Sequence, residues 1–393
     1  MVFDLFLCSF IVLTFTNVDA TLQLPIRKKE VPIASLYHHN FSVQTSNSQS
    51  LSDYYGSFYV LELTLGTPVQ TFHVALESST SDLWVVDSEC KEQQCKGYPE
   101  SGYTKSQYDK TKSTTYKSDD RQFNITYQSG LSCTGQLAID VIGLGGYSFD
   151  DQTFGAAMSI PAAFGYVSID GYVGFGLKSQ IDSNLVGPIL NLAKQFDQPV
   201  FTIWLDRYSA QTNIDSGGLI TFGSTDVKNC DSDITQAATS SSDSWTFELE
   251  KFGFGKYTYD SPASALLNIG MSFIGIPTNI FQTVMKTLNA DYDDTYQMYT
   301  IDCGKSASSP KMLFTVNGNE LFIEGNDYIL DFGFDLGKCG VAVFDMSTTQ
   351  ISTDWVIGET FCRIYCTTFD VGNSQDTLLS EMQCQYMKEC VYD

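Results

Sequence analysis

Apolar, β-branched and aromatic residues are concentrated in short runs, each bounded by Gly, Pro, Asn, Asp or Ser, from about residue 54 to about residue 370. Runs of this kind are typical of β-strands. They predict strands over residues 58–65, 71–76, 82–86, 218–223 and 354–358. Helical spacing of apolar residues is confined to a few stretches, of which 189–196 and 280–288 are the best candidates. The pattern therefore predicts a mostly-β protein with occasional helices.

The hydrophobic pattern also contains a hidden duplication. In the first half, two apolar residues run into a polar loop at 75–81, and an apolar segment ending in Gly follows at 169–174. In the second half the same succession occurs at 266–272 and at 354–358. Repeated segments of this size indicate two similar structural units. We therefore predict two lobes that face each other across a cleft, over residues 54–235 and 236–372.

Both ends of the chain depart from this texture. Residues 5–15 are apolar and small residues follow at 18–20, which predicts a signal peptide over 1–20, although Asp4 stands where a basic residue is usual. The run is too short for a typical transmembrane helix. A polar, Ser-rich leader, extended or partly ordered, is predicted over 21–53. Residues 373–393 form an atypical tail, of which 374–393 are polar, helix-prone and contain two cysteines.

Composition narrows the possible partners and compartments. Acidic residues outnumber basic ones 46 to 22 among 393 residues, so the formal net charge is −24. This argues against nucleic acid and anionic membranes as partners, since both require basic patches. The acidity fits either simple solubility or work in an acidic compartment. Together with the signal peptide, it predicts a secreted protein or one in the endosomal or lysosomal lumen.

Cysteine and histidine usage bears on redox state and metals. One of the eleven cysteines lies in the signal peptide, and the other ten suggest disulfides formed in an oxidising compartment. Histidine occurs only at positions 38, 39 and 73, so a Cys/His zinc site is not expected, and no other metal or cofactor is expected either. Sequons begin at Asn40 and Asn124, which predicts a glycoprotein.

Several segments together carry a resemblance to a known family. They are Gly66-Thr67-Pro68, 82–86 (DLWVV), the Cys-x4-Cys segment within 90–116, 125–127 (ITY), 199–205 (PVFTIWL), 217–220 and 355–361 (WVIGETF). In order and spacing they resemble pepsin-like aspartic proteases, most of all those of the nematode digestive tract. The resemblance implies a monomer with a bilobal β fold, and a cleft that takes a peptide or protein ligand beneath a flap.

Catalysis in such a family requires two aspartates that share one proton, because two carboxylates about 3 Å apart cannot both ionise. The ionised partner takes a proton from a water, which attacks the peptide carbonyl that the other partner polarises. Each aspartate lies in an Asp-Thr-Gly loop. The Thr hydroxyl braces the opposite loop, the Gly lets backbone amides approach, and the next Ser or Thr donates to an outer carboxylate oxygen.

Residues 77–80, the first loop, retain part of this pattern. Glu77 keeps a carboxyl group on a side chain longer by one methylene, and a misplacement of about 1 Å costs ~100-fold in rate. Ser78 keeps the bracing hydroxyl and Thr80 keeps a donor. Ser79 places a side chain where the family needs Gly, which predicts a crowded loop.

Residues 268–271, the second loop, retain less. Asn268 has nearly the size of Asp but cannot ionise. Ile269 lacks the bracing hydroxyl and Met271 lacks the outer donor, so Gly270 alone follows the pattern.

The two loops leave three functional hypotheses open. The first is a secreted pseudoprotease that binds peptides or proteins, the second an active acid endopeptidase working through Glu77, and the third a glycoprotein that acts through its surface.

The resemblance also assigns residues outside the two loops. Tyr127 is expected to close over the cleft as a flap residue, with Trp84 behind it. The implied disulfides are Cys90–Cys95 and Cys303–Cys339. Cys230–Cys366 is one candidate pair, which would tie the central sheet, but the pairing of Cys133, Cys230, Cys362, Cys366, Cys384 and Cys390 stays open. In the family, the leader places a Lys against the two aspartates. Lys28, Lys29 and His38 are candidates for this role here, although they are more simply interpreted as surface charges.

Overall fold

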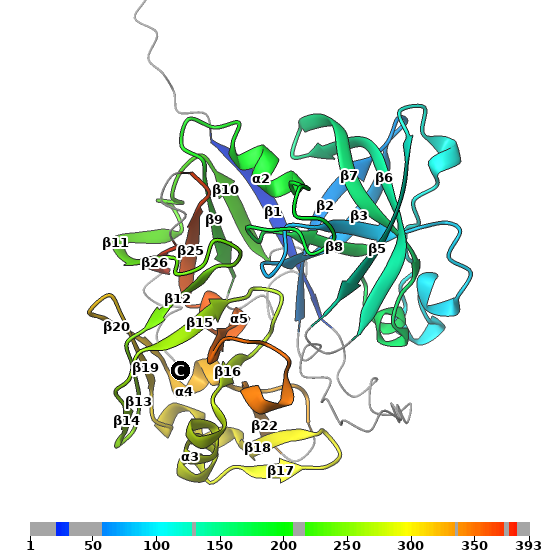
Figure 1. Cartoon of the computed structure of the whole chain (residues 1–393). Coiled ribbons are helices and arrows are strands. Elements are labelled where there is room, and N and C mark those ends of the chain that lie inside the picture. Colours follow the sequence, from blue (N-terminus) through cyan, green and yellow to red (C-terminus); the bar gives the residue numbers. More distant parts are fainter. Residues whose placement is uncertain are drawn as a thin grey trace, which may run out of the picture.

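The computed structural model describes residues 21–30, 57–127, 131–206, 217–334, 337–372 and 377–382 (Figure 1). The predicted signal peptide, His38, Asn40, Cys384 and Cys390 lie outside these residues, and the side chain of Lys29 is not described. The protein is mostly β, with two lobes, as the sequence predicts. No helix in the described part of the chain has the length and apolarity needed to cross a membrane.

Four strands of the first half carry the first loop. β3 (Gln70–Glu77) runs parallel to β8 (Gly171–Gly174), which is antiparallel to β4 (Leu83–Val86), and β4 runs parallel to β7 (Tyr147–Ser159). β8 and β4 are buried along their whole length. Strands covered on both faces are apolar throughout rather than alternating, which explains their sequences.

Four strands of the second half repeat this arrangement. β15 (Ala263–Leu267) runs parallel to β24 (Trp355–Ile357), which is antiparallel to β16 (Ile274–Ile276), and β16 runs parallel to β23 (Val343–Asp345). The strand orders β3-β8-β4-β7 and β15-β24-β16-β23 are therefore equivalent. The duplication predicted from the sequence is present as two copies of one strand pattern.

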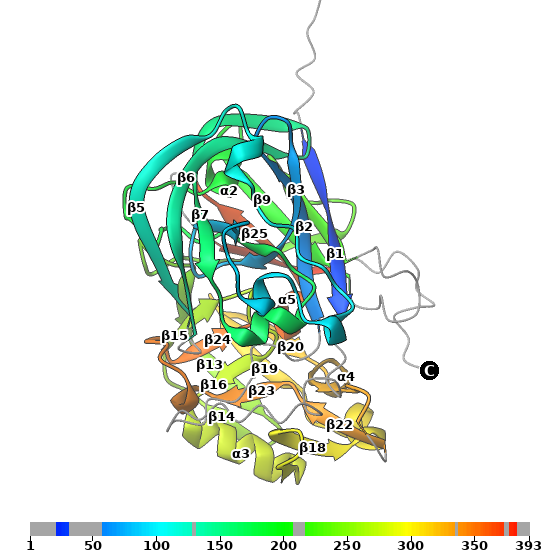
Figure 2. The same cartoon turned by 90° about the vertical axis from the view of Figure 1, so that its right-hand side faces the viewer.

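A central sheet connects the two lobes. Its strands are β11 (Cys230–Ala237), β26 (Thr377–Met382), β25 (Tyr365–Asp370), β9 (Val200–Leu205), β10 (Gly218–Phe222), β1 (Leu22–Glu30) and β2 (Ser57–Leu65), in that order. Beyond β2 the sheet continues through β3 into the first lobe. β1 comes from the predicted leader and joins the two parts of the sheet, as Figures 1 and 2 show.

The prediction that residues 374–393 are helix-prone is wrong for Thr377–Met382. This segment is strand β26, which pairs antiparallel with β25 on one side and with β11 on the other. Hydrogen bonding along both edges of a strand outweighs local helical preference. The tail therefore contributes a strand to the central sheet.

The remaining elements cover the lobes. β5 (Lys117–Thr126) and β6 (Ser132–Leu144) extend the first lobe. In the second lobe β12 (Thr246–Leu249) pairs with β15, and two four-stranded sheets have the orders β14-β13-β19-β20 and β17-β18-β22-β21. Their strands are β13 (Lys251–Phe254), β14 (Tyr257–Tyr259), β17 (Asp291–Asp293), β18 (Met298–Asp302), β19 (Met312–Val316), β20 (Asn319–Ile323), β21 (Ile329–Leu330) and β22 (Lys338–Val341). Among the described residues the α-helices are α2 (Pro188–Ala193), α3 (Thr278–Leu288), α4 (Gly325–Tyr328) and α5 (Glu359–Cys362).

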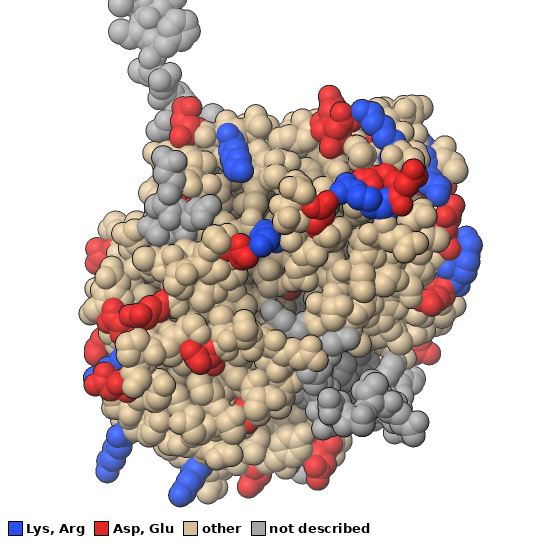
Figure 3. Space-filling view, in the orientation of Figure 1, with Lys and Arg blue, Asp and Glu red and all other residues tan. Residues whose placement is uncertain are grey.

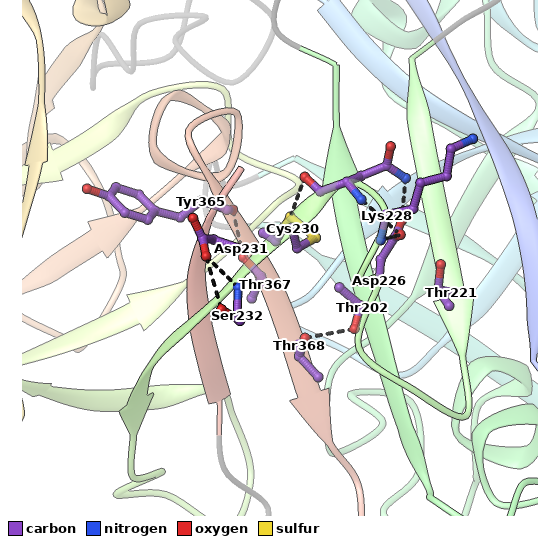
Figure 4. Close-up of a disulfide and its surroundings, with 12 residues drawn as sticks. Thr202, Thr221, Asp226, Lys228, Cys230, Asp231, Ser232, Tyr365, Thr367 and Thr368 are labelled. Atoms are coloured by element: carbon purple, nitrogen blue, oxygen red, sulfur yellow. Dashed lines mark hydrogen bonds between the residues drawn. A yellow bond between two sulfur atoms is a disulfide. The ribbon is translucent and has the colours of Figure 1, made fainter. Parts of the chain in front are cut away.

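The described part of the chain contains three disulfides. Cys90–Cys95 and Cys303–Cys339 are the pairs that the resemblance implies, and Cys230–Cys366 is the candidate pair whose partners the sequence left open. Cys133 and Cys362 are buried free thiols. Figure 4 shows Cys230–Cys366 in the central sheet. Because Cys230 and Cys366 both pair with residues of β26, this disulfide joins the two strands that flank the tail strand.

We predict that replacing both Cys230 and Cys366 by Ser lowers the free energy of unfolding by roughly 4 kcal/mol, because that disulfide closes a long loop. Its two cysteines are 136 residues apart, against 5 for Cys90 and Cys95. The same double replacement at Cys90 and Cys95 should cost roughly 2 kcal/mol. Guanidinium unfolding of the oxidised proteins measures both values, and equal losses would contradict the prediction.

Candidate functional site

The two loops of interest begin where equivalent strands end. β3 ends at Glu77, whose carbonyl accepts a hydrogen bond from the backbone N–H of Phe175. β15 ends at Leu267, and the N–H of the next residue, Asn268, donates to the carbonyl of Ile357. Glu77 is 5% exposed and Asn268 is 1% exposed. The structure therefore brings the two predicted dyad positions into the buried region between the lobes.

The carboxyl group of Glu77 reaches from the first loop to the second. Its Oε1 accepts a hydrogen bond from the backbone N–H of Ser79 at 2.8 Å. Its Oε2 lies against Gly270, where a Cβ atom would be only 2.5 Å from that oxygen. The longer side chain thus fills the space beside Gly270, and any larger residue at position 270 would have to displace it.

Asn268 is held by its own loop. Its Oδ1 accepts a hydrogen bond from the backbone N–H of Gly270 at 2.8 Å. The amide is close enough to Glu77 to favour the ionised carboxylate. Even so, Asn268 Nδ2 makes no hydrogen bond of standard geometry within the described part of the chain. A buried donor without a hydrogen bond destabilises the fold. Glu77 and Asn268 therefore do not form a bond that could take the place of the proton shared by two aspartates.

Burial raises the pKa of Glu77 above its ordinary value, and the nearby donors of Ser79, the Asn268 amide and Ser78 oppose this rise only in part. The fold therefore favours the neutral acid. Asn268 cannot ionise, so no second carboxyl stands at the facing position to complete the pair. What remains is one carboxyl beside an amide.

The raised pKa predicts a pH-dependent stability effect at Glu77. The folded state favours the neutral Glu77 carboxyl. The contribution of this preference to the free energy of unfolding is therefore complete below the ordinary glutamate pKa, and it declines as pH rises toward the folded pKa. We expect Glu77→Gln to raise the melting temperature relative to the native chain at pH 7.5. At pH 4 it should have little effect. Thermal unfolding at the two pH values measures this, and an equal change at both would contradict it.

Ser78 fulfils the bracing role expected of it. Its hydroxyl donates to the carbonyl of Leu267 at 3.0 Å and accepts from the backbone N–H of Ile269 at 3.0 Å. Ser78 is fully buried, so both bonds lie inside the molecule. The reciprocal bonds from the second loop cannot form because Ile269 has no hydroxyl. The brace between the loops is therefore one-sided.

Thr80 does not act as the resemblance implies. Its hydroxyl donates to the carboxylate of Asp82 at 2.5 Å, and no hydrogen bond from it to Glu77 is found. Asp82 also accepts from the Ser179 hydroxyl. An acidic side chain two residues away in the same loop therefore takes this donor.

Ser79 also differs from expectation. Instead of crowding the loop, its half-buried side chain joins its backbone N–H in stabilising the ionised form of Glu77. Ser79 has no positive φ, so its backbone does not need Gly.

The second loop is supported by α5. The backbone N–H of Glu359 donates to the carbonyl of Met271 at 2.7 Å, and both the N–H and the hydroxyl of Thr360 donate to the carbonyl of Ser272. Met271 itself is buried in a small apolar cluster with Phe273 and Val356. An apolar side chain therefore occupies the position where an outer hydrogen-bond donor was expected.

On the flap side of the site, Tyr127 and Trp84 are joined by a hydrogen bond. The indole N–H of Trp84 donates to the Tyr127 hydroxyl at 2.6 Å, and the Tyr127 N–H donates to the Leu131 carbonyl, which closes the hairpin. Burial is the main cause that raises the pKa of Tyr127 well above its ordinary value, and the charge of Glu77 adds to the rise. Tyr127 therefore lies close enough to Glu77 to interact with it electrostatically.

Two aromatic residues of this side were not predicted as site residues. The ring centroids of Phe164 and Tyr172 lie 5.9 and 5.4 Å from Tyr127, and 6.0 and 5.7 Å from Trp84. Tyr172 lies inside the repeated 169–174 segment, so its strand position was available as a signal. Phe164 carries no comparable signal, because a single aromatic in a loop is usually a core residue.

Figure 3 shows that this face of the molecule is hollowed near its middle, and that charged side chains lie mostly toward the edges.

In the described ranges a single group of side chains is close enough to hold a metal: Cys90, Glu92 and Cys95. Its two cysteines are disulfide-bonded and so cannot act as thiolate ligands.

Comparisons with known proteins agree with this geometry. Residues 58–378 match the model of the family "Eukaryotic aspartyl protease". The chain is 37% identical to Aspartic protease 1 of Caenorhabditis elegans over 91% of this chain and 93% of that protein. It is 32% identical to Aspartic protease 17 of the same organism over 84% of each chain, and 28% identical to the Probable vacuolar protease A of Trichophyton verrucosum over 88% of this chain and 82% of that protein. The chain therefore belongs to the eukaryotic aspartyl protease family.

Proposed function

We propose that this protein is a secreted aspartic protease homologue that does not cleave peptide bonds and instead binds peptides or proteins in its cleft. In this proposal Glu77 and Asn268 occupy the two catalytic positions without carrying out the reaction. The observation that carries the proposal is that the carboxyl group of Glu77 lies against Gly270 beside an amide that cannot ionise. General acid–base attack by water requires one carboxylate and one carboxylic acid at these positions.

The supporting groups favour the same conclusion. The Thr80 hydroxyl is committed to Asp82, and Ile269 and Met271 supply no hydroxyl. Catalysis depends on preorganised donors around the reacting carboxyls. By contrast, Tyr127 and Trp84 keep their hydrogen bond above the site. An extended peptide binds through backbone hydrogen bonds to strands and hairpins, which need no dyad.

We also propose the compartment and the domain limits from the sequence. The predicted signal peptide and the three disulfides support secretion or delivery to an endosomal or lysosomal lumen. The proposed lobes are residues 54–235 and 236–372, and the molecule is proposed to act as a monomer. Asn124 is exposed on β5, which supports its proposed glycosylation.

Peptide binding is tested by fluorescence polarisation with a labelled digest of casein at about pH 4.5. We expect the native chain to bind without shortening the peptides. Tyr127→Ala should weaken binding about tenfold or more, because flap residues position the ligand backbone. Val227→Ala, at a residue that is 79% exposed, is the control and should bind as the native chain does. No binding by the native chain, or equal binding by Tyr127→Ala, would favour a protein that acts through its surface.

A further inference from the structure

The amide of Asn268 contains a buried donor that the fold does not use. Its Oδ1 accepts a hydrogen bond from the backbone N–H of Gly270 at 2.8 Å, which fixes the carbonyl end of the amide against its own loop. The other end, Nδ2, has no hydrogen-bond partner among the described residues, and Asn268 is only 1% exposed. A buried donor without a partner destabilises the fold, so a ligand atom that accepts from Nδ2 removes a cost already present.

Glu77 supplies a second donor beside this amide. Its Oε1 already accepts from the backbone N–H of Ser79, so the proton of the neutral acid is best placed on Oε2. A Cβ on Gly270 would lie 2.5 Å from Oε2 of Glu77 and 3.2 Å from Oδ1 of Asn268. The carboxyl and the amide therefore lie on the same side of Gly270, where one ligand group can contact both.

The neighbours of Glu77 are polar but uncharged. Ser78, Ser79 and the Asn268 amide are nearby donors, and burial raises the pKa of Glu77 in spite of them. Tyr127 is the titratable residue on the flap side, and its pKa lies well above its ordinary value, so its hydroxyl is neutral as well. An anionic group that enters here meets these donors and faces no negative charge from any of these neighbours.

This pair offers a ligand something different from what two aspartates offer. Two aspartates that share one proton present one donor and one ionised acceptor. Neutral Glu77 and the Nδ2 of Asn268 both present donors. The group that matches two donors is one with two acceptor oxygens and no proton of its own, which describes a carboxylate. A primary amide matches less well, because its N–H group would face a donor.

We propose that the peptide group bound by this pair is a carboxylate, which accepts the proton of Glu77 in one hydrogen bond and an N–H of Asn268 in another. The ligand then supplies the second carboxyl that position 268 lacks, so that one proton lies between two carboxyl groups. The inference rests on the proposed function and adds a chemical class to it. The favoured peptides present either a C-terminal carboxylate or an acidic side chain to Glu77 and Asn268.

Competition by three forms of a tryptic globin digest tests the proposal in the full chain. The first form is unmodified. The second comes from globin whose carboxyl groups are amidated before digestion, so that only the newly cut C-termini are carboxylates. The third is amidated after digestion, which blocks C-termini and side chains alike. Each form displaces the labelled casein digest at pH 5, where a peptide C-terminus with a pKa of about 3.5 is ionised.

We expect the unmodified digest to compete at least ~10-fold more strongly than the fully amidated one, because hydrogen bonds to an ionised acceptor are roughly twice as strong as neutral ones. The digest amidated before cutting identifies the source of the carboxylate. If it competes as the unmodified digest does, the bound group is the C-terminus. If it competes only as the fully amidated digest does, the bound group is an acidic side chain.

Two variants of the pair test the same preference from the protein side. Glu77→Met removes the acid proton, and Asn268→Asp places a carboxyl of the protein where the ligand carboxylate would bind. In both, the preference for the unmodified digest over the fully amidated one should fall below ~3-fold. Glu320→Met, at an exposed residue of β20, is the matched control and should keep the native preference. The readout is a ratio within one sample, so a smaller folded fraction does not alter it.

The outcomes separate this inference from the proposed function. Equal competition by the unmodified and fully amidated digests would overturn the inference and leave peptide binding intact. A native preference in Glu77→Met or in Asn268→Asp would also overturn it, since the carboxylate would then bind elsewhere. Failure of the native chain to bind the labelled casein digest at all would contradict the proposed function, and the inference would fall with it.

Discussion

A variant carrying Glu77→Asp, Ser79→Gly, Asn268→Asp, Ile269→Thr and Met271→Thr is expected to digest casein at about pH 4 at least ~1,000-fold faster than the native chain. Glu77→Asp shortens the side chain that now lies against Gly270. Asn268→Asp supplies the second ionisable carboxyl, so that the two groups can share a proton. The three other replacements restore the Gly and the two hydroxyls of the family loops.

The rest of the site provides the physical reason for this expectation. Ser78 already bridges the loops, and Tyr127 and Trp84 are already joined above them. The strands that deliver the loops are paired as in the opposite lobe. If the proposed function is right, the defect lies in the two loops, so replacing their residues together should restore turnover.

Asn268→Asp alone is the matched control for the five-substitution variant. We expect less than a ~10-fold gain from it, because the Glu77 carboxyl would still be displaced toward Gly270 by its extra methylene. Casein digestion measured by release of acid-soluble peptides, with and without pepstatin, compares the two variants. A five-substitution variant that has native circular dichroism but no activity would show that the defect extends beyond the two loops.

Trp245→Ala is expected to lower the free energy of unfolding by about 4 to 5 kcal/mol, which is a large loss for one side chain. Trp245 is fully buried, and its ring centroid lies 4.8 Å from that of Phe369. Its indole N–H donates to the carbonyl of Phe175 at 2.8 Å, and its own carbonyl accepts from the N–H of Leu267. The replacement therefore leaves a cavity and an unpaired carbonyl.

The position of Trp245 explains why its loss should affect both lobes. Phe175 follows β8, beside the first loop, whereas Leu267 immediately precedes Asn268. Trp245→Phe, which retains a ring but not the N–H, should lose less, and Val227→Ala at an exposed residue should change stability by less than ~0.5 kcal/mol. Guanidinium unfolding at one pH measures all three, and a loss below about 2 kcal/mol for Trp245→Ala would contradict the prediction.

The general fold was predictable because its pattern is repeated. The sequence grouped the apolar segment at 75–76 with 169–174, and the one at 266–267 with 354–358. In the structure the first pair forms the parallel strands β3 and β8, and the second forms β15 and β24. Strands buried on both faces leave a strong apolar signal. The helices at 188–193 and 278–288 follow from helical spacing in the same way.

The parts that could not be predicted depend on contacts between distant segments. Residues 377–382 look helical in isolation and become a strand because β11 and β25 pair with them. The Thr80 hydroxyl has two acidic neighbours, and the sequence does not show that it bonds to Asp82 rather than to Glu77. Nor does a sequence reveal that the Glu77 carboxyl lies on Gly270, since this depends on how the two lobes meet.

The central claim is that the native chain lacks aspartic protease activity, and the most direct test is digestion of haemoglobin or casein at about pH 3 to 5. The native chain, Glu77→Ala and a pepstatin-treated sample are compared at equal concentration. The proposed function predicts the same background cleavage in all three. Cleavage by the native chain that disappears in Glu77→Ala would contradict it and would identify Glu77 as the working acid of an active enzyme.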